Sequence, residues 1–143
     1  MTTDQKGAIA EAKVTAAAIE LGVGVSKPLA PLPYDLIFDV QGRLMRDQCK
    51  WAGLEGDTLA IRCRRCRRGP NGLVHRGYAD DEIDAFAAYC AGLDRCYFIT
   101  VDSVARRTMV MLRVAPTRNN QQSFINWASE YEFGATLTKL VGP

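Results

Sequence analysis

The sequence predicts an α/β fold in which a mixed central β-sheet is flanked by helices. Three observations support this class: a long helix-forming segment opens the chain, a β-hairpin pattern follows it, and strand-like and helix-like runs come after the hairpin. The 143 residues are enough for a hydrophobic core, so residues 1–143 are predicted to form a single domain.

An alanine-rich segment, residues 4–21, stops at Gly22 and therefore predicts a helix with a glycine cap. Residues 23–29 predict a short edge strand, because their proline would interrupt a central one. Alternating and β-branched runs indicate strands, and apolar residues at helical spacing indicate helices. The later predicted elements are a hairpin of residues 35–40 and 44–51, a strand at 58–65, an amphipathic helix at 79–93, strands at 95–101 and 107–114, and a short helix at 121–131.

The composition is that of a globular protein, with 48% hydrophobic and 24% charged residues. No apolar run is long enough to cross a bilayer, and no signal-peptide pattern opens the chain. We therefore expect a cytoplasmic protein without a membrane partner. The net charge of +2 does not by itself indicate a nucleic-acid partner.

The distribution of charge is more informative than its total. Five arginines fall within seven residues, a cluster that suits a phosphate-rich partner such as DNA. The cluster consists of Arg62, Arg64, Arg65, Arg67 and Arg68. Arg62 and Arg64 are predicted to share one strand face, and the other three to continue into a turn at residues 69–72. The alternative is a solvated edge strand that charge protects from aggregation.

The five cysteines are expected to be reduced, because no secretion signal is present. Cys63 and Cys66 have the spacing of half a zinc site. The residues available to complete it are Cys90, Cys96 and His75. They offer no second tight pair, so buried free thiols are the simpler interpretation.

The predicted hairpin carries polar residues where a small domain usually has hydrophobic ones. A two-residue turn at 41–42 gives a register that puts Asp35 opposite Gln48. Lys50 lies two residues after Gln48 and shares its face. A carboxylate, an amide oxygen and an ammonium group are therefore expected in one patch. A four-residue loop keeps this register, whereas a three-residue loop turns one strand's side chains to the other face.

Glu11 adds a second carboxylate. Its neighbours at helical spacing carry no positive charge, and the hydroxyl of Thr15 is expected to bond its own helix backbone. Small residues let this helix sit close to a sheet, so Glu11 either reaches water or finds a partner there.

Each of these polar residues also has an ordinary structural interpretation. Glu11 would be solvated at the edge of its helix, and Asp35 would cap the preceding turn. Gln48 would face water, and Lys50 would be a solubilising edge lysine.

Oxygen ligands of this kind suit a hard cation such as Mg²⁺, for which Mn²⁺ is a substitute. Asp35 and Gln48 would supply two oxygens, and Glu11 would hold a metal-bound water. Such water has a lowered pKa and becomes a nucleophile. Lys50 would orient it or neutralise charge that builds on phosphorus. The pattern predicts hydrolysis of a phosphodiester, with the arginine cluster holding the substrate backbone.

The pair Tyr34-Asp35, followed after twelve residues by Gln48-Cys49-Lys50, resembles the core motif of the PD-(D/E)XK endonuclease superfamily. Residues 6–14 look like the first helix of that family, with Glu11 matching its active-site glutamate. The similarity covers roughly residues 6–133 and is closer to bacterial enzymes of the group I intron homing type. Three segments carry that closer resemblance, namely the Q-x-K variant, a strand at 97–101 and an Arg-Asn-Asn-Gln segment at 118–121.

The resemblance implies a restriction-endonuclease-like core and a Mg²⁺-dependent DNA endonuclease, site-specific and homing-like. It implies that Asp35 and Gln48 bind metal, that Lys50 is catalytic, and that Glu11 completes the site. Two positions depart from the pattern. Tyr34 replaces a proline, and Gln48 replaces a carboxylate, which removes a negative charge and should weaken metal affinity. Two alternatives therefore stand beside it: a structure-specific nuclease such as a Holliday junction resolvase, and an inactive DNA-binding module.

Further DNA contacts are expected outside the arginine cluster, from Lys6 and from the loop at 117–122. The loop residues expected to contact phosphates or base edges are Arg118, Asn119, Asn120 and Gln121. The alternative is that the asparagines form turns and cap the following helix. Because one small active site cuts one strand, cleavage of both strands favours a homo-oligomer, either a dimer or a tetramer.

Overall fold

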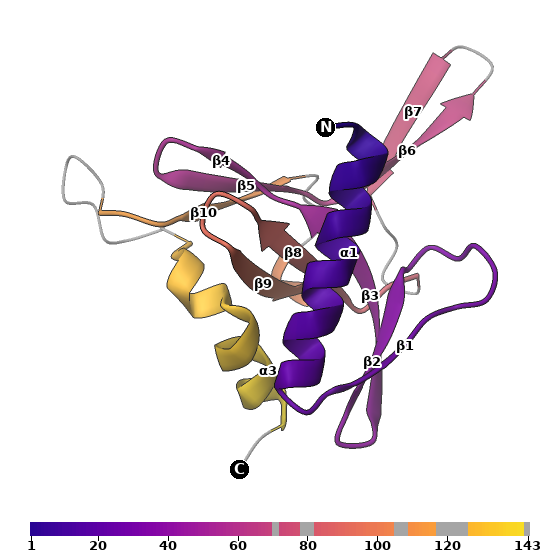
Figure 1. The fold of residues 1–143 in the computed structure, drawn as a ribbon. Helices are drawn as coiled ribbons and strands as arrows, with labels where there is room; N and C mark the ends of the chain where they lie inside the picture. Colours follow the sequence, from indigo (N-terminus) through magenta and orange to yellow (C-terminus); the bar gives the residue numbers. More distant parts are fainter. Residues whose placement is uncertain (70–71, 78–81, 105–108, 117–125, 142–143) are drawn as a thin grey trace.

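The computed structural model of the protein describes residues 1–69, 72–77, 82–104, 109–116 and 126–141 (Figure 1). The helices are α1 (Thr3–Glu20), α2 (Val101–Val104), α3 (Phe133–Val141) and the 3-10 helix η1 (Ala128–Tyr131). The strands are β1 (Gly24–Ser26), β2 (Leu36–Val40), β3 (Arg43–Trp51), β4 (Gly53–Glu55), β5 (Thr58–Arg62), β6 (Arg64–Gly69), β7 (Gly72–Gly77), β8 (Ala85–Cys90), β9 (Arg95–Thr100) and β10 (Met109–Arg113).

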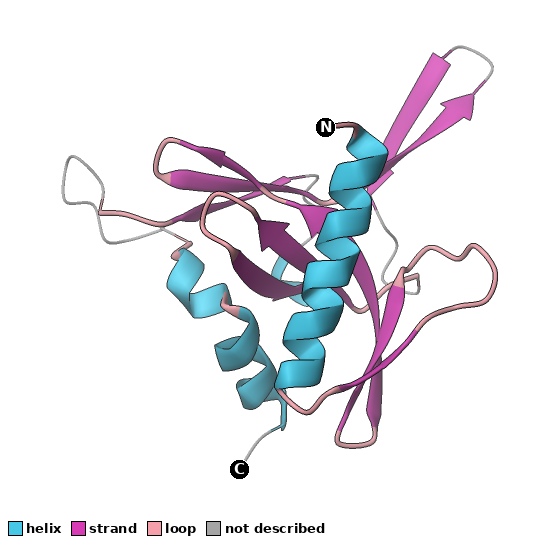
Figure 2. Ribbon diagram, viewed as in Figure 1, coloured by secondary structure: helices cyan, strands magenta, loops and turns pink. Residues whose placement is uncertain are grey.

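The central sheet has the strand order β1-β2-β3-β8-β9. Strands β3 and β8 run parallel, and the other neighbours run antiparallel, so the sheet is mixed as predicted. Helices α1 and α3 cover one face of this sheet (Figure 2). A smaller sheet of order β10-β5-β4 packs on the other face, and β6 and β7 form a separate two-stranded ribbon.

Two hydrophobic clusters lie on the two faces of the central sheet. The cluster under the helices contains Phe38, Phe98 and Phe133, whose rings meet at centroid distances of 5.7–6.3 Å. The cluster toward the smaller sheet contains Leu59 and Ile99, among others. Strand β8 contributes to both clusters, so the middle of the sheet is buried on its two sides.

The predicted N-terminal helix is confirmed, with start and stop signals of the expected kind. The Thr2 side chain accepts a hydrogen bond from the backbone N–H of Gln5, and the Gln5 side chain accepts one from the backbone N–H of Thr2. This capping box satisfies two backbone groups that the helix leaves unpaired. Gly22 has a φ of 79°, which a residue with a Cβ adopts with strain. No described helix has both the length and the apolar character needed to span a membrane.

The hairpin register is also confirmed. Val40 pairs with Arg43 across a two-residue turn. Gln41 and Gly42 have φ angles of 52° and 89°, as a type I′ turn requires. The carboxylate of Asp39 accepts a hydrogen bond from the backbone N–H of Gly42 at 2.7 Å, which fixes the turn further. Strand β1 lies at the sheet edge, where its sequence predicted it.

The helix predicted at residues 79–93 is wrong. Residues Ala85–Cys90 form strand β8 instead, between β3 and β9. All six of its residues are buried, because one face packs under the helices and the other against the smaller sheet. A short run that is apolar on every side does not distinguish a buried strand from a helix, and alanine's preference for helix gives way to burial.

The strand predicted at residues 58–65 is divided in two. Strand β5 ends at Arg62, and β6 begins at Arg64 in a different sheet, so these arginines do not share a strand face. The arginines predicted to enter a turn lie in β6, which pairs with β7. Strands β4 and β7 and helices α2 and α3 were not predicted. The short helix expected at 121–131 is present only as η1 within the described residues.

Candidate active site

Asp35 lies one residue before β2 and is fastened to β3 by two hydrogen bonds. Its backbone N–H donates to the carbonyl oxygen of Asp47 at 2.8 Å. Its carboxylate oxygen Oδ2 accepts a hydrogen bond from the backbone N–H of Cys49 at 2.9 Å. Asp35 follows directly on the last paired residues of the hairpin, Leu36 and Asp47, and is bonded to the residues on either side of Gln48. The half-buried carboxylate is thereby bonded to the backbone of β3 through Oδ2.

The electrostatics of Asp35 connect it to the other predicted residues. Burial raises its pKa, the hydrogen bond from the Cys49 backbone opposes this, and the charge of Glu11 raises it further. The positive charges of Lys50 and Lys27 lower it again. Asp35 therefore lies close enough to two opposing charges and one like charge for each to affect its ionisation.

Gln48 and Lys50 lie on the same face of β3, as predicted. In the parallel register they are partnered by Phe86 and Ala88 of β8, which belong to the core toward the smaller sheet. Both side chains are half-buried. The charge of Lys50 affects both Asp35 and the thiol of Cys63, whose pKa burial raises to about 11. The lysine is therefore part of the boundary between the two sheets rather than a freely solvated edge residue.

Glu11 does find a partner, and the partner comes from the loop after β1. The ammonium group of Lys27 forms an ion pair and hydrogen bond with Glu11 Oε1. The side chain of Glu11 is 25% exposed, while that of Lys27 is 68% exposed. Thr15 bonds the backbone carbonyl of Glu11 at 2.7 Å, as expected. Lys27 could not be predicted as this partner, because it lies 16 residues after Glu11 in the chain and no helical spacing relates the two.

Asp47 is a second residue that the sequence analysis missed. It is fully buried under α1, between Arg46 and Gln48 on β3. Among the described residues, neither carboxylate oxygen of Asp47 has a hydrogen-bond partner. Burial raises its pKa well above the usual value, and the charge of Asp84 adds to this. The alternation along β3 indicates this position, since Met45 and Cys49 on either side are also buried.

Arg46 and Asp84 form a bidentate ion pair that joins β3 to the start of β8. The Nε and Nη2 atoms of Arg46 donate to the two carboxylate oxygens at 3.1 and 3.2 Å. Burial alone would raise the pKa of Asp84, but the hydrogen bonds from Arg46 hold it below the usual value. This pair fixes the strand that carries Gln48 and Lys50.

The remaining predicted DNA contacts are only partly described. Lys6 lies on α1 with its ammonium group 5.8 Å from the ring centroid of Trp51, and Arg62 is exposed. The other four arginines of the cluster have a described backbone in β6. The loop residues Arg118, Asn119, Asn120 and Gln121 lie outside the described residues.

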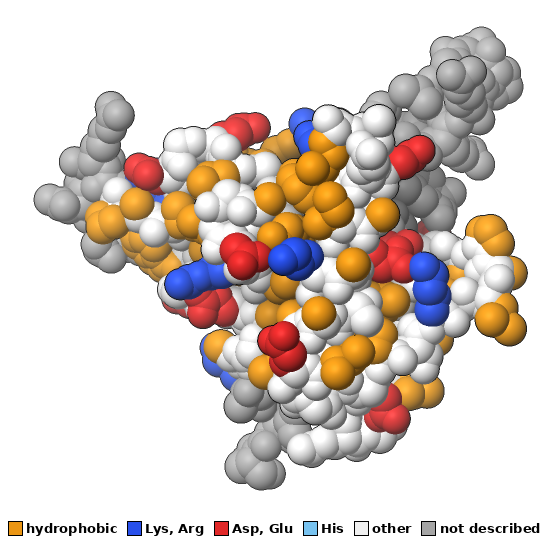
Figure 3. Space-filling model, viewed as in Figure 1, with side chains coloured by type: hydrophobic (Ala, Val, Ile, Leu, Met, Phe, Trp, Pro, Cys, Tyr) orange, Lys and Arg blue, Asp and Glu red, His pale blue; other side chains and the backbone are white. Residues whose placement is uncertain are grey.

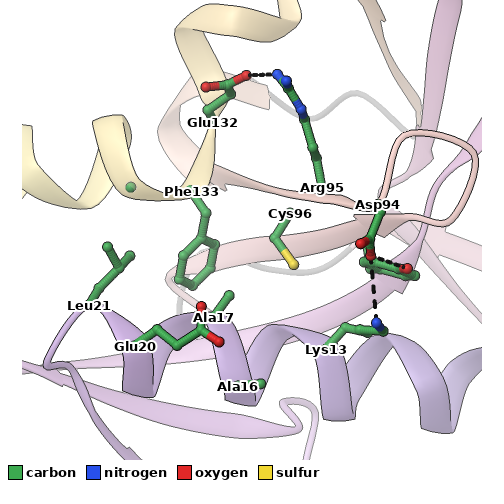
Figure 4. A pocket seen from close by; sticks show the side chains of 12 residues that line it. Lys13, Ala16, Ala17, Glu20, Leu21, Asp94, Arg95, Cys96, Glu132 and Phe133 are labelled. Carbon is green, nitrogen blue, oxygen red and sulfur yellow. Dashed lines mark hydrogen bonds and ion pairs between the residues drawn. The ribbon is translucent and has the colours of Figure 1, made fainter.

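A separate groove of about 550 Å³ lies between α1 and α3 (Figure 4). Four of its charged groups form two ion pairs, Lys13 with Asp94 at 3.5 Å and Arg95 with Glu132 at 2.6 Å, and Glu20 also lines the groove. The Tyr89 hydroxyl donates to Asp94 at 2.7 Å. None of the predicted site residues that the structure describes lines this groove.

The donor set near the hairpin fits a hard cation by its chemistry. Asp35, Gln48 and Glu11 offer carboxylate and amide oxygens, which Mg²⁺ and Mn²⁺ prefer over softer ligands. No three histidine, cysteine, aspartate or glutamate side chains gather into a metal site among the described residues. A metal here would therefore rely on few protein ligands and on water. The zinc alternative likewise has no such cluster in the described part of the chain, where Cys63 and Cys90 are buried in the core.

A mixed sheet covered by an N-terminal helix, with an aspartate at the start of one hairpin strand and Gln-x-Lys on the other, defines a nuclease core. The chain matches the model of the PD-(D/E)XK endonuclease family over residues 1–134 and belongs to that family. It is therefore a nuclease, an enzyme of the hydrolase class.

A solved structure agrees with this assignment. The chain is similar to the bacterial homing endonuclease I-Ssp6803I, with 28% sequence identity and a TM-score of 0.77. The match covers 97% of this chain and 95% of that chain, which confirms the restriction-endonuclease-like fold. No curated protein was found to match.

Proposed function

We propose that the chain is a metal-dependent DNA endonuclease, site-specific and homing-like, whose active site is centred on Asp35. One observation carries the proposal: the Asp35 carboxylate is fixed by the Cys49 backbone, with the charges of Glu11 and Lys50 close enough to change its ionisation. A carboxylate held beside a second carboxylate and an ammonium group is suited to a metal and a phosphate.

Asp35 and Gln48 would hold Mg²⁺ or Mn²⁺, and Glu11 would complete the site. When bound, the metal would supply a water of lowered pKa and neutralise negative charge on the phosphate. The protein's own part is to keep Asp35 ionised and in place. Burial opposes ionisation, so the positive charge of Lys50 and the bond from the Cys49 N–H are needed to favour it.

Lys50 is proposed to act on the phosphate side of the site. Its half-buried ammonium group would orient the attacking water and stabilise the charge that develops on the phosphate oxygens. The Arg46–Asp84 pair would hold β3 so that Lys50 keeps its position.

DNA contact is proposed for the ribbon formed by β6 and β7, which projects from the body of the molecule in Figure 1. The major groove, about 12 Å wide, admits a two-stranded ribbon. Register places Arg65 opposite Arg76, so the two strands bring basic positions together. Lys6, Arg62 and the segment 118–121 would add contacts to the phosphates. Cleavage of both strands would require a dimer or tetramer.

A second candidate is a DNA-binding module that has lost catalysis. Two observations favour it: Gln48 brings no charge to the site, and the described residues hold no cluster of three metal-ligating side chains of the usual kinds. The fold and the two-stranded ribbon of β6 and β7 would serve either function.

Cleavage assays distinguish these candidates. The full chain is incubated with a supercoiled plasmid pool carrying random inserts and with a four-way junction, in Mg²⁺, Mn²⁺ or EDTA. Lys50→Met is the catalytic variant and Lys13→Met is the control, because Lys13 lines the groove between α1 and α3. Ends produced from the pool are sequenced to recover a target site.

We expect metal-dependent cleavage at a defined sequence, lost in Lys50→Met and kept in Lys13→Met. Preference for the junction would make the enzyme structure-specific instead. Tight DNA binding without cleavage under all metal conditions would favour the inactive module. Absence of both cleavage and binding would overturn the proposal.

A further inference from the structure

Lys27 brings a positive charge into contact with Glu11, one of the carboxylates of the proposed site. It comes from the loop between β1 and β2, immediately before Pro28, and its ammonium group pairs with Glu11 of α1. The charges of Glu11 and Asp35 both raise the pKa of Lys27, Glu11 the more strongly through its hydrogen bond. The ammonium group is therefore bonded to Glu11, and the charge of Asp35 acts on it as well.

The two carboxylates need such a counter-charge. The charge of Glu11 raises the pKa of Asp35, so the two acidic groups repel each other. Lys27 opposes this from the loop side, and Lys50 opposes it from β3. The two lysines differ in their surroundings, because Lys50 is half-buried beside the second sheet while Lys27 is mostly exposed.

We propose that Lys27 is the resident counter-ion of the Glu11–Asp35 pair, and that a divalent metal must displace its ammonium group from Glu11 in order to bind. The inference rests on the proposed metal site, and it adds a residue that competes with the metal. A divalent cation and an ammonium group at one carboxylate repel each other and compete for the same negative charge, so removal of one favours the other.

The surroundings allow the exchange. Lys27, Glu11 and small residues of α1 line an open furrow of about 490 Å³. In Figure 3, acidic and basic groups adjoin beside α1 at the side of the loop. The Lys27 side chain is long and largely solvated, so its ammonium group has water to enter when it leaves Glu11. A released ammonium group at this place is also free to meet a DNA phosphate.

Calorimetric titration of the full chain with Mn²⁺, without DNA, tests the exchange. The variants are Lys27→Met, Lys27→Gln, Lys27→Arg, Glu11→Gln and the double variant Glu11→Gln/Lys27→Met. Lys13→Met is the matched control. It also removes one positive charge beside α1, but Lys13 pairs with Asp94 and not with Glu11. Circular dichroism confirms that each variant is folded.

We expect Lys27→Met and Lys27→Gln to lower the Kd for Mn²⁺ by about two- to fivefold, the scale of an exposed ion pair. Lys27→Arg and Lys13→Met should keep the wild-type value. In the Glu11→Gln background, loss of Lys27 should have a smaller effect than in the wild type, because the paired oxygen is no longer charged. Unchanged or weaker Mn²⁺ binding in both Lys27→Met and Lys27→Gln would overturn the inference. A wild-type chain that binds no Mn²⁺ would instead remove the proposed metal site, and the inference with it.

Discussion

The carboxylate of Asp35 accepts a hydrogen bond from the backbone N–H of Cys49, at 2.9 Å. This contact ties the end of the loop after β1 to the strand that carries Gln48 and Lys50. The position of the proposed metal ligand is therefore set by the sheet backbone, and substitutions of Asp35 can separate its charge from its structural role.

Asp35→Asn should abolish cleavage while the fold is kept. Asparagine retains an oxygen that accepts from the Cys49 N–H, but it lacks the charge that a metal requires. We expect cleavage to fall by more than about 100-fold, with little change in the unfolding temperature. Asp35→Ala should lose the hydrogen bond too and destabilise the protein by about 1 kcal/mol. Parallel cleavage and thermal unfolding measurements separate the two effects, and full activity in Asp35→Asn would contradict the assignment.

Gln48→Glu should strengthen metal binding. It restores the carboxylate that the family pattern has at this position and adds a negative charge beside Asp35. Because charge count tunes the affinity of oxygen sites, we expect the Kd for Mn²⁺ to fall by about tenfold. Calorimetric titration with Mn²⁺ measures this directly. A third protein, Gln48→Leu, has a side chain of similar size without a ligand oxygen and should bind Mn²⁺ more weakly than the wild type. Equal affinities in all three proteins would place Gln48 outside the metal site.

Asp47→Asn should stabilise the protein at neutral pH and leave it unchanged in acid. Burial raises the pKa of Asp47 well above the usual value, so the folded chain holds a proton that the unfolded chain releases above about pH 4. The stability associated with this group is present below the unfolded pKa and is lost as pH rises toward the folded pKa.

We expect the variant to exceed the wild type by about 1–3 kcal/mol at pH 8 and to match it near pH 4. Denaturant unfolding at both values measures the difference. Asp102→Asn, at an exposed carboxylate in α2, serves as the control and should show no such trend. A wild type that is the more stable at pH 8 would show that Asp47 has a charged partner in solution.

Phe133→Ala should detach α3 from the sheet. Its ring lies 5.7 Å from Phe38 and 5.8 Å from Phe98, measured between centroids, and is buried. Large-to-small substitution in such a core costs about 3–5 kcal/mol. Leu29→Ala, at a fully exposed loop residue, should cost almost nothing. Similar unfolding free energies for the two variants would contradict the packing described for α3.

Substitution of the β6 arginines should weaken binding to DNA of any sequence, because the contacts are made to phosphates. Each substitution that removes an arginine–phosphate contact should reduce the magnitude of the slope of log K against log salt concentration by about 1. Arg65→Ala and Arg67→Ala, tested singly and together by fluorescence anisotropy across a salt series, measure this. Arg43→Ala, exposed at the turn between β2 and β3, is the control. If Arg43→Ala changes the slope and the β6 variants do not, the DNA lies on another surface.

The elements that could be predicted are those whose signals are local. Gly22 and the alanine-rich segment before it specify α1, and Gln41-Gly42 specifies the turn that sets the hairpin register. Strand β8 could not be predicted in the same way. The composition of residues Ala85–Cys90 favours a helix. They form a strand because both of their faces are buried, one under the helices and the other against the smaller sheet.

The residues of the candidate site also include some that sequence signals indicate and some that only tertiary contacts bring to the site. The faces of Gln48 and Lys50 follow from strand alternation, and the resemblance to a family indicated Glu11 and Asp35. Lys27 depends on a tertiary contact between the loop after β1 and α1, which no spacing in the sequence encodes. Strand alternation does place Asp47 on the buried face of β3, between Met45 and Cys49.

The most direct test of the nuclease assignment compares wild type with Lys50→Met on the random-insert plasmid pool in Mg²⁺ and in EDTA. We expect cleavage by the wild type in Mg²⁺ alone, and a loss of about 100-fold or more in the folded Lys50→Met variant. Cleavage that persists in EDTA, or that is equal in the two proteins, would contradict it.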